Sequence, residues 1–274
     1  MTHSRPHIHE LLNDAGLAPR RDLGQNFVAD PNTVRRIASL AGVGPGDSVV
    51  EIGAGLGSLT LALAETGADV TAVEVDRGIV PILRDVVADV ANVRVVEADA
   101  MTADWGTILA ERDRWTLIAN LPYNVATPLV ADLLDGVPAV TSMLVMVQRE
   151  VAERLAAAPG SKQYGAVSVK VAYWATARVV GVVPATVFVP RPNVESALVR
   201  IDRRMPPSTE PDALFPLVRQ AFGQRRKMLR RSLAGTVSAE QFAAAGVDPQ
   251  LRPEQLAVDD WCRLADAVTV GTVP

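Results

Sequence analysis

The stretch Ser48–Thr60, which reads SVVEIGAGLGSLT, decides the fold of this chain. Its first part is apolar and β-branched, which is typical of a buried parallel strand, and apolar residues at helical spacing follow three glycines at alternate positions. Glycine adopts positive φ without steric cost and has no Cβ, so a ligand can lie against bare main chain at such a turn. The stretch therefore predicts a strand, a ligand-binding turn and a helix; a turn that only lets the helix pack closely is the alternative.

The glycine spacing favours one class of ligand. Dinucleotide-binding turns place their third glycine where this chain has Ser58, whereas the pattern Gly53-x-Gly55-x-Gly57 is typical of methyltransferases that bind S-adenosyl-L-methionine. The segment 69–75 predicts the next strand, and Glu74 near its end can accept hydrogen bonds from both hydroxyls of a ribose. A nicotinamide dehydrogenase is the less favoured alternative, because no acid for hydride transfer is evident.

Composition bounds the class of protein. A chain of 274 residues with 49% hydrophobic and 21% charged residues can hold one substantial α/β domain and a small appendage. Its single cysteine, Cys262, excludes a disulfide framework and suits a reducing compartment. No apolar run is long enough to cross a bilayer, and residues 1–10 are polar without a signal core. We expect a cytoplasmic monomer that makes no membrane contact.

The histidines and the prolines indicate how the chain is divided. All three histidines, His3, His7 and His9, lie in the leading segment, and no cysteine or acidic cluster joins them at metal-ligand spacing. We therefore expect no metal, and a flexible segment over residues 1–22. A proline-rich seam at 205–211 separates a catalytic domain, expected over residues 23–204, from a helical RNA-binding domain, expected over residues 212–274.

Two further segments supply candidate cofactor residues. Gln25 and Asn26 stand beside an aromatic residue and can close over the cofactor from outside the sheet, with a helix-capping turn as the alternative. Asp99 and Ala100 follow a third strand predicted at 93–97. A carboxylate at that place can accept a hydrogen bond from an adenine amino group; an N-cap is the alternative, and the two preceding matches favour the ligand role.

The fourth predicted strand, 115–119, ends in the sequence Asn120-Leu121-Pro122-Tyr123. An adenine amino group is a poor nucleophile because its lone pair is delocalised into the ring, so an enzyme must orient it. The Asn120 side-chain oxygen and the Leu121 carbonyl can accept its two hydrogens, Pro122 fixes the turn, and Tyr123 can stack on the base. Positioning supplies most of the rate and no general base is needed. An ordinary turn is the minority interpretation.

The rest of the chain predicts the last strands and a basic surface. Apolar segments at 169–183 and 197–201 predict two antiparallel strands, and Phe188 lies on the loop between them, as a core anchor or as a base-stacking residue. The net charge is −4, yet cationic residues gather near the carboxyl end. A continuous helix is predicted across this cluster, with Arg219, Arg226 and Arg230 on one face, either solvated or bound to phosphates. The candidate RNA-binding residues are Arg225, Arg226, Lys227 and Arg230.

Taken together, the motifs of this chain resemble the KsgA family of small-subunit ribosomal RNA adenine dimethyltransferases. The resemblance spans nearly the whole chain and is carried by Gly24–Phe27, Glu51–Gly55, Glu74, Asp99, Asn120–Asn124, Gln148–Val151, Tyr164–Gly165, Phe188–Pro192 and Gln224–Lys227. It implies an α/β fold: a Rossmann-like class I methyltransferase domain, with a mostly parallel seven-stranded sheet whose last strand is antiparallel, and a small all-helical carboxyl-terminal domain. It also implies N6,N6-dimethylation of two adjacent adenosines near the 3′ end of 16S ribosomal RNA, in the small subunit or its precursor.

The resemblance assigns roles to individual residues. Cofactor contacts fall on Asn26, Val28, Gly53, Glu74, Asp99 and Asn120, and our candidates for the cofactor also include Gln25, Gly55 and Ala100. The target adenine is expected between Tyr123 and Phe188. Two departures stand out: Ala54 replaces the usual proline of the glycine motif, and Val28 replaces the commoner leucine. Neither removes a ligand group.

Two other functions share these features. The first is a macrolide-resistance type of enzyme that methylates 23S ribosomal RNA. The second is a non-catalytic assembly factor that uses the fold only as a scaffold to bind precursors of the small subunit. The Asn120–Asn124 motif favours the small-subunit enzyme over the first, and intact Glu74 and Asp99 argue against the second.

Overall fold

The structure is a computed structural model that describes residues 2–20 and 23–270. The chain forms two compact units, each described separately below. The first contains the residues up to Ala152 together with Arg178–Asp202, and the second contains Glu153–Ala177 and the chain from Arg203 on. The domain boundary that the sequence predicted, near 204–212, therefore omits a segment, because residues 153–177 belong with the carboxyl-terminal helices.

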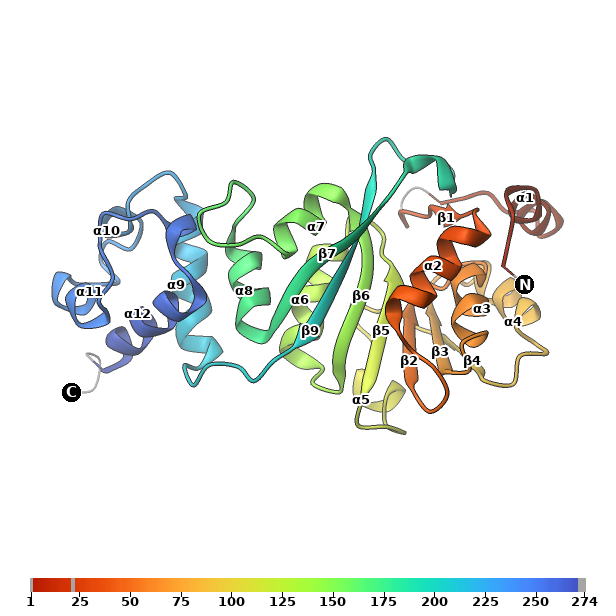
Figure 1. The fold of residues 1–274 in the computed structure, drawn as a ribbon, viewed down its shortest axis with the longest axis horizontal. Helices are drawn as coiled ribbons and strands as arrows, with labels where there is room; N and C mark the ends of the chain where they lie inside the picture. The colour runs from red at the N-terminus through yellow and green to blue at the C-terminus, as the bar shows by residue number, and fades with distance from the viewer. Residues whose placement is uncertain (1, 21–22, 271–274) are drawn as a thin grey trace. The chain divides into compact units, whose positions relative to one another are not determined.

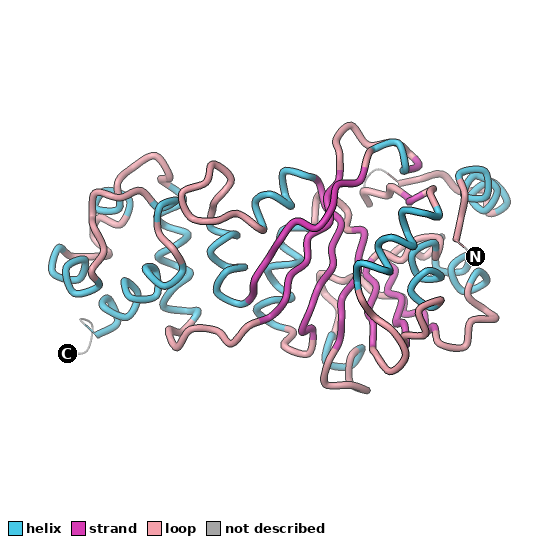
Figure 2. The backbone as a smooth tube through the Cα atoms, in the orientation of Figure 1, coloured by secondary structure: helices cyan, strands magenta, loops and turns pink. Residues whose placement is uncertain are grey.

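A seven-stranded sheet in the order β4-β3-β2-β5-β6-β9-β7 organises the first unit (Figures 1 and 2). The strands from β2 to β6 run parallel to their neighbours, and β9 is antiparallel to β6. This is the Rossmann-like arrangement that the motifs predicted, with the antiparallel strand placed inside the sheet. The bounds are β2 (Ser48–Ile52), β3 (Asp69–Glu74), β4 (Val93–Glu97), β5 (Trp115–Asn120), β6 (Val140–Gln148), β7 (Ala175–Val183) and β9 (Ser196–Arg203).

Helices connect these strands, and their ends follow ordinary capping rules. The helix α2 (Pro31–Ala41) begins at Asp30, whose side chain accepts from the Thr33 amide, and ends at Gly42 with φ of 68°. The other helices that follow strands up to β6 are α3 (Ser58–Ala64), α4 (Ile79–Val86), α5 (Trp105–Ile108), α6 (Ala126–Gly136) and α7 (Arg149–Leu155).

A second, two-stranded sheet joins distant parts of the first unit. The strand β1 (Phe27–Val28) is antiparallel to β8 (Phe188–Val189), which follows a short 3-10 turn, η1 (Ala185–Val187). Phe27 pairs with Val189, and Val28 pairs with Phe188. The pairing fixes the segment that carries Gln25 and Asn26 beside the loop that carries Phe188.

The leading segment is helical, so the prediction of a flexible segment over residues 1–22 is wrong for its described part. Residues Arg5–Asp14 form α1, in which Ile8 and Leu12 are buried. These two residues lie four positions apart on one helical face and pack in a cluster with Phe27 and Leu56. The helix is stable here because that apolar face is covered.

The second unit is helical and has its own core. Its buried aromatic and aliphatic residues come from both of its chain segments, among them Tyr164, Tyr173, Phe215 and Trp261. The apolar segment 169–183, predicted as strand, is helical up to Trp174, because its first turns pack into this core. The elements are α8 (Ala166–Trp174), α9 (Pro211–Gly223), α10 (Leu229–Ser232), α11 (Ala239–Ala245), η2 (Pro253–Gln255) and α12 (Val258–Val270).

The continuous helix predicted across the basic cluster is interrupted. Helix α9 ends at Gly223, and Lys227 donates its amide to the carbonyl of Gln224 in a turn. The amide of Leu229, at the start of α10, bonds to the carbonyl of Leu251 instead of continuing a helical ladder. Arg226 therefore lies on the turn, and the face shared with Arg219 and Arg230 does not exist.

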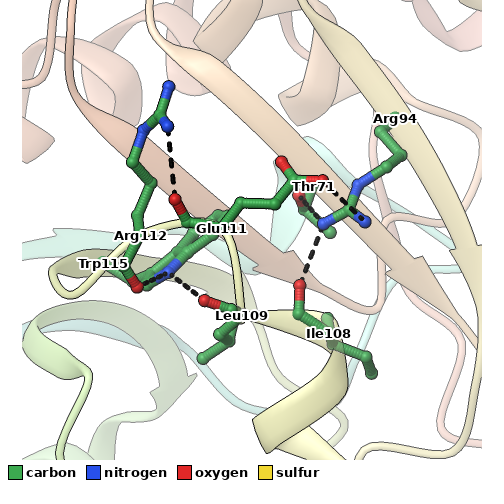
Figure 3. A network of polar contacts seen from close by, with 7 residues as sticks. All are labelled: Thr71, Arg94, Ile108, Leu109, Glu111, Arg112 and Trp115. Atoms are coloured by element: carbon green, nitrogen blue, oxygen red, sulfur yellow. Dashed lines mark hydrogen bonds and ion pairs between the residues drawn. The ribbon is translucent and has the colours of Figure 1, made fainter.

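Hydrogen bonds stabilise the end of the sheet at which the parallel strands β2, β3 and β5 begin (Figure 3). The Arg94 guanidinium donates to the hydroxyl of Thr71 at 3.1 Å and to the carbonyl of Ile108 at 2.9 Å. The indole of Trp115 donates to the carbonyls of Leu109 and Arg112. These contacts anchor the α5 region on the sheet. In the described chain, no helix combines the length and the apolar character needed to span a membrane.

Candidate cofactor and adenine site

Two adjoining cavities lie where the parallel strands end. They have volumes of about 100 Å³ and about 180 Å³, and both are lined by Leu23, Gly53, Val75 and Pro122. Each is smaller than the roughly 300 Å³ at which small-molecule pockets usually begin. A ligand of cofactor size must therefore extend through both cavities and pass the glycine turn between them.

The glycine turn needs its glycines. Gly53 and Gly55 have φ of 70° and 55°, a backbone conformation that residues other than glycine rarely adopt. A Cβ on Gly55 would stand 3.1 Å from the Phe27 ring, so any side chain there would push Phe27 away. The turn thus brings main chain to the first cavity, as the sequence predicted, and the aromatic ring of β1 packs directly on it.

Glu74 lies at the end of β3 and ties the glycine turn to its own strand. Its carboxylate accepts from the amide of Gly55 at 2.7 Å and from the amides of Val75 and Asp76 at 3.0 and 2.9 Å. Burial raises the pKa of Glu74, against the opposing effect of these hydrogen bonds. A carboxylate has about four acceptor positions, so with three of them taken it can still accept from a ribose hydroxyl.

The second cavity is an apolar slot with one carboxylate at its rim. Asp99 accepts from the amide of Met101 at 2.9 Å through one oxygen, in a turn. The N-cap of the following helix α5 is Asp104, so the N-cap interpretation of Asp99 is wrong and its ligand role stays a prediction. Ala100 lines the slot, and its carbonyl accepts from the indole of Trp105. Val75 and Met101, which line the slot too, are 44% and 38% exposed although apolar. They offer flat contact to a purine ring.

Sequence reasoning did not identify Val75 and Met101 as site residues. A signal was available, because each is an apolar residue placed one or two positions after a predicted acidic ligand, Glu74 or Asp99, where a solvent-facing loop would normally be polar. Val28 lines the first cavity, as expected from the resemblance.

Gln25 and Asn26 line the first cavity, but their side chains form hydrogen bonds to other residues of the protein. The Gln25 amide accepts from the Arg20 amide at 2.8 Å and donates to Asp76 at 2.7 Å. The Asn26 side chain donates to the carbonyl of Gly24 at 2.9 Å. Gln25 therefore links the loop to the end of β3. Its side-chain oxygen and nitrogen, which were predicted to contact the cofactor, already have hydrogen-bond partners within the chain.

Asn120 lies at the end of β5 with a fixed side-chain orientation. Its amide nitrogen donates to the carbonyl of Asn26 at 2.9 Å, which leaves the side-chain oxygen as an acceptor at the cavity. Leu121, Pro122 and Tyr123 line the same cavity. The structure thus brings together the four residues predicted to orient an amino group.

Tyr123 is anchored through its hydroxyl. The phenol oxygen lies 2.8 Å from Oγ of Ser196, a fully buried residue that begins β9 and pairs with Gln148 of β6. Burial raises the pKa of Tyr123, so the phenol stays neutral. The ring is therefore held from two sides, by its own loop and by the sheet.

Phe188 does not lie at the cavity, so its predicted stacking role is not supported. Its side chain is fully buried in a cluster with Val34, Ile37 and Leu198. Successive residues of a strand point to opposite faces, and Val189, the next residue of β8, packs with Phe27 instead. Of the two roles that the sequence left open, the structure gives Phe188 that of a core anchor.

Glu51 is a buried carboxyl group at the cavity that the sequence did not single out as a ligand. It is 2% exposed, and the Thr60 hydroxyl donates to it at 2.5 Å. Burial raises the pKa of Glu51 to about 8, and nearby Glu74 acts in the same direction. Glu51 is therefore largely protonated at neutral pH.

Replacing Glu51 should change how stability depends on pH. The folded protein holds this proton up to about pH 8, whereas the unfolded chain releases it near pH 4.3. The contribution of Glu51 is thus complete below pH 4.3 and falls by about 1.4 kcal/mol per pH unit until it is lost above pH 8. Urea unfolding at pH 6 and pH 8 should show Glu51→Gln gaining stability relative to wild type as the pH rises. Parallel profiles, like those expected for exposed Glu65→Gln, would contradict the assignment.

The charges at the cavities indicate the kind of ligand. Glu74 and Asp99 line them together with the largely protonated Glu51, and among the described residues that line either cavity there is no lysine or arginine. Carboxylates at the cavities favour a ligand that brings positive charge, as a sulfonium cofactor does. No group of histidine, cysteine and acidic residues able to hold a metal ion is found within residues 2–20 and 23–270.

The basic residues of the second unit differ in what they can contact. Arg226, Lys227 and Arg230 are exposed. Arg225 donates to the carbonyl of Lys162 at 2.6 Å and lies 3.9 Å from the carboxylate of Glu254. The first three can reach a phosphate backbone, and Arg225 stabilises the unit itself.

The sheet order, the glycine turn and the acidic cavity define a Rossmann-like methyltransferase of the class that uses S-adenosyl-L-methionine. The family model of the ribosomal RNA adenine dimethylases matches residues 16–269, and the chain belongs to this family. It is an S-adenosylmethionine-dependent ribosomal RNA methyltransferase. The resemblance seen in the sequence is thereby confirmed.

Individual relatives agree with this assignment. A protein of Thermobifida fusca called ribosomal RNA small subunit methyltransferase A is 48% identical over 94% of this chain and 93% of its own length. A protein of the same name from Bifidobacterium adolescentis is 46% identical over 95% of this chain and 92% of its own.

Solved structures share the fold. The 23S ribosomal RNA methyltransferase ErmE is 25% identical, with a TM-score of 0.69 over 89% of this chain and 99% of its own. A dimethyladenosine transferase from Plasmodium falciparum is 23% identical, with a TM-score of 0.72 over 86% of this chain and 94% of its own.

Proposed function

We propose that the protein transfers methyl groups to N6 of two adjacent adenosines near the 3′ end of 16S ribosomal RNA, in the small subunit or its precursor. The observation that carries this proposal is Asn120, which lines the cavity beside Leu121 and Tyr123 and whose amide nitrogen is held by the Asn26 carbonyl. The identity of nearly half of all residues to small subunit methyltransferases supports the choice of RNA. The proposal places the protein in the cytoplasm, where small subunits are assembled, and has it act as a monomer.

Cofactor binding is proposed to use both cavities. Glu74 would accept from the ribose and Asp99 from the cofactor adenine, Val75 and Met101 would contact that adenine, and Gly53 and Gly55 would leave room for the chain of the methionine. Ala100, Asn26 and Val28 complete the walls. When bound, the cofactor would supply an electrophilic methyl group.

The chain's own residues orient the target. The Asn120 oxygen and the Leu121 carbonyl accept the two hydrogens of the adenine amino group and turn its lone pair toward the methyl carbon. Tyr123 stacks on the base and limits its rotation. The methylated ammonium is acidic and loses its proton to water, so no base with a shifted pKa is required. Held in this geometry, the reacting atoms need little further ordering.

The 23S enzyme is the second candidate, because the likeness to ErmE covers nearly all of both chains. One experiment distinguishes between the two candidate substrates. Purified protein is incubated with labelled S-adenosylmethionine and an equimolar mixture of unmodified small and large ribosomal subunits. We expect the label in the small subunit; label in the large subunit would establish the alternative, and no label in either would favour the assembly factor.

The anchoring of Tyr123 can be measured by a double-mutant cycle. Tyr123→Phe and Ser196→Ala each remove one hydroxyl of the pair at 2.8 Å and keep the aromatic face. Each should lower kcat about fivefold to tenfold, the effect of one hydrogen bond, and the double variant should be no slower than either. Multiplied losses in single-turnover methylation would show that the two hydroxyls act separately.

The exposed basic residues should set how RNA affinity depends on salt. Replacing Arg226, Lys227 and Arg230 by alanine should reduce the slope of log affinity against log salt by about 0.7 to 1 for each phosphate that the variant no longer neutralises. Filter binding to 16S fragments at several salt concentrations measures this. Arg114→Ala, which removes an exposed cation just before β5, is the control and should leave the slope unchanged. An unchanged slope in the triple variant would place the RNA elsewhere.

A further inference from the structure

The amino-terminal segment reaches the cofactor cavity. The side chain of Ile8, on α1, lines the first cavity and is fully buried. It packs in one cluster with Leu56 of the glycine turn and with Phe27, whose ring lies against Gly55. This helix therefore forms part of the cavity wall and also supports the residues beside it.

His3 fastens this segment to the glycine turn. Its Nε2 donates to the carbonyl of Leu56 at 2.7 Å, and its backbone amide donates to the hydroxyl of Ser58 at 3.3 Å. Leu56 and Ser58 both line the first cavity. Only 3% of His3 is exposed, and burial lowers its pKa, so the ring is neutral and Nε2 carries the donated hydrogen. A buried imidazole must keep such a partner, because an unpaired one is costly.

Arg5 links the same segment to the chain around η1 and β8. Its guanidinium donates to the carbonyls of Thr186 at 2.8 Å and Phe188 at 3.2 Å. Phe188 belongs to β8, which pairs with β1 and so holds the chain next to Asn26. The segment thus bridges the glycine turn and the small sheet, two parts of the site that are far apart in the sequence.

We propose that residues 3–12 are a working part of the cofactor site, in which Ile8 is a wall contact for S-adenosylmethionine and His3 and Arg5 are positioning residues. The inference rests on the proposed function for the identity of the ligand. Preorganised walls raise affinity because less ordering remains to be done on binding. Each of two adenosines needs two methyl groups, so the site must be re-formed for several cofactor molecules on one RNA.

The test compares His3→Ala with His9→Ala, which removes an exposed histidine on α1, the helix that follows His3. Calorimetry with S-adenosylmethionine should show a dissociation constant about tenfold higher for His3→Ala, the effect of a lost buried hydrogen bond, and no change for His9→Ala. His3→Gln, whose amide nitrogen can donate to Leu56, should recover most of the affinity. Hydrogen exchange without cofactor should be faster at the amides of residues 56–58 in His3→Ala alone.

Wild-type affinity in His3→Ala, with unchanged exchange at the glycine turn, would overturn the inference. Equal weakening by His3→Ala and His3→Gln, with exchange faster throughout the first unit, would also overturn it, because the effect would then be one of general stability. Methyl transfer by the wild type is measured in parallel. If the wild type binds the cofactor but labels no ribosomal RNA, the proposed function fails, and the comparison of His3 variants still decides the role of the segment.

Discussion

Asn120→Ala should lower the rate of methyl transfer by about 100- to 1,000-fold, the range for removing one preorganised polar group from an active site. The substitution removes the side-chain oxygen proposed to accept from the adenine amino group and also the donor that binds the Asn26 carbonyl at 2.9 Å. Asn120→Asp keeps an acceptor but places its second oxygen against that carbonyl, so it should be slow as well. Single-turnover methylation of small subunits measures both.

Two controls make the Asn120 result specific. Asn32→Ala, an exposed amide on α2, should retain wild-type rates. Binding of Asn120→Ala to small-subunit particles should persist, because the exposed basic residues lie elsewhere in the chain. Full methyl transfer by Asn120→Ala would contradict the mechanism, and loss of particle binding in proportion to activity would count against separate binding and catalytic roles.

Glu74→Ala should weaken cofactor binding by roughly 100-fold, as expected for the loss of a hydrogen bond from a ribose hydroxyl to a charged group. It also leaves the amides of Gly55, Val75 and Asp76 without their acceptor, which loosens the glycine turn. Calorimetry with S-adenosylmethionine and with S-adenosylhomocysteine measures the loss for both ligands.

Glu97→Gln is the control for Glu74→Ala. Glu97 occupies the corresponding position of the neighbouring strand β4, but it is exposed and pairs with Arg77. It should bind the cofactor as wild type does. An unchanged affinity in Glu74→Ala would mean that the ligand does not contact the end of β3, and the cofactor geometry would have to be abandoned.

Strong local patterns explain why the sheet and most of its ligands could be predicted. The apolar run before Gly53 fixes a buried strand, and parallel strands place Glu74, Asp99 and Asn120 at one edge once their strands are recognised. Each of these residues is found at a cavity of the structure.

Pairings between distant short segments explain the failures. The strands β1 and β8 have only two residues each and are far apart in the chain, so no hydrophobic periodicity in the sequence predicts them. Their register decides that Phe188 faces the core and that Val189 faces the cluster around Phe27. A shift by one residue would exchange the two faces, which is why the role of Phe188 could not be derived from its position in the sequence.

The leading segment was misjudged for a different reason. Its histidines and other polar residues suggested a solvated tail, but one imidazole, that of His3, is buried against the Leu56 carbonyl. The apolar residues Ile8 and Leu12 held a helical signal that is too short to be convincing alone. The helix is stable only because Phe27 and Leu56 cover its apolar face.

The chemistry at the adenine amino group is tested most directly by the nucleosides that the enzyme makes. Small subunits that lack the modification are incubated with the protein and S-adenosylmethionine, and the 3′ fragment of their 16S RNA is digested and analysed by mass spectrometry. The account predicts N6,N6-dimethyladenosine at two adjacent positions. Methyl groups on a ring nitrogen, on a carbon or on ribose would contradict it, because Asn120 and Leu121 would then not be holding the exocyclic nitrogen.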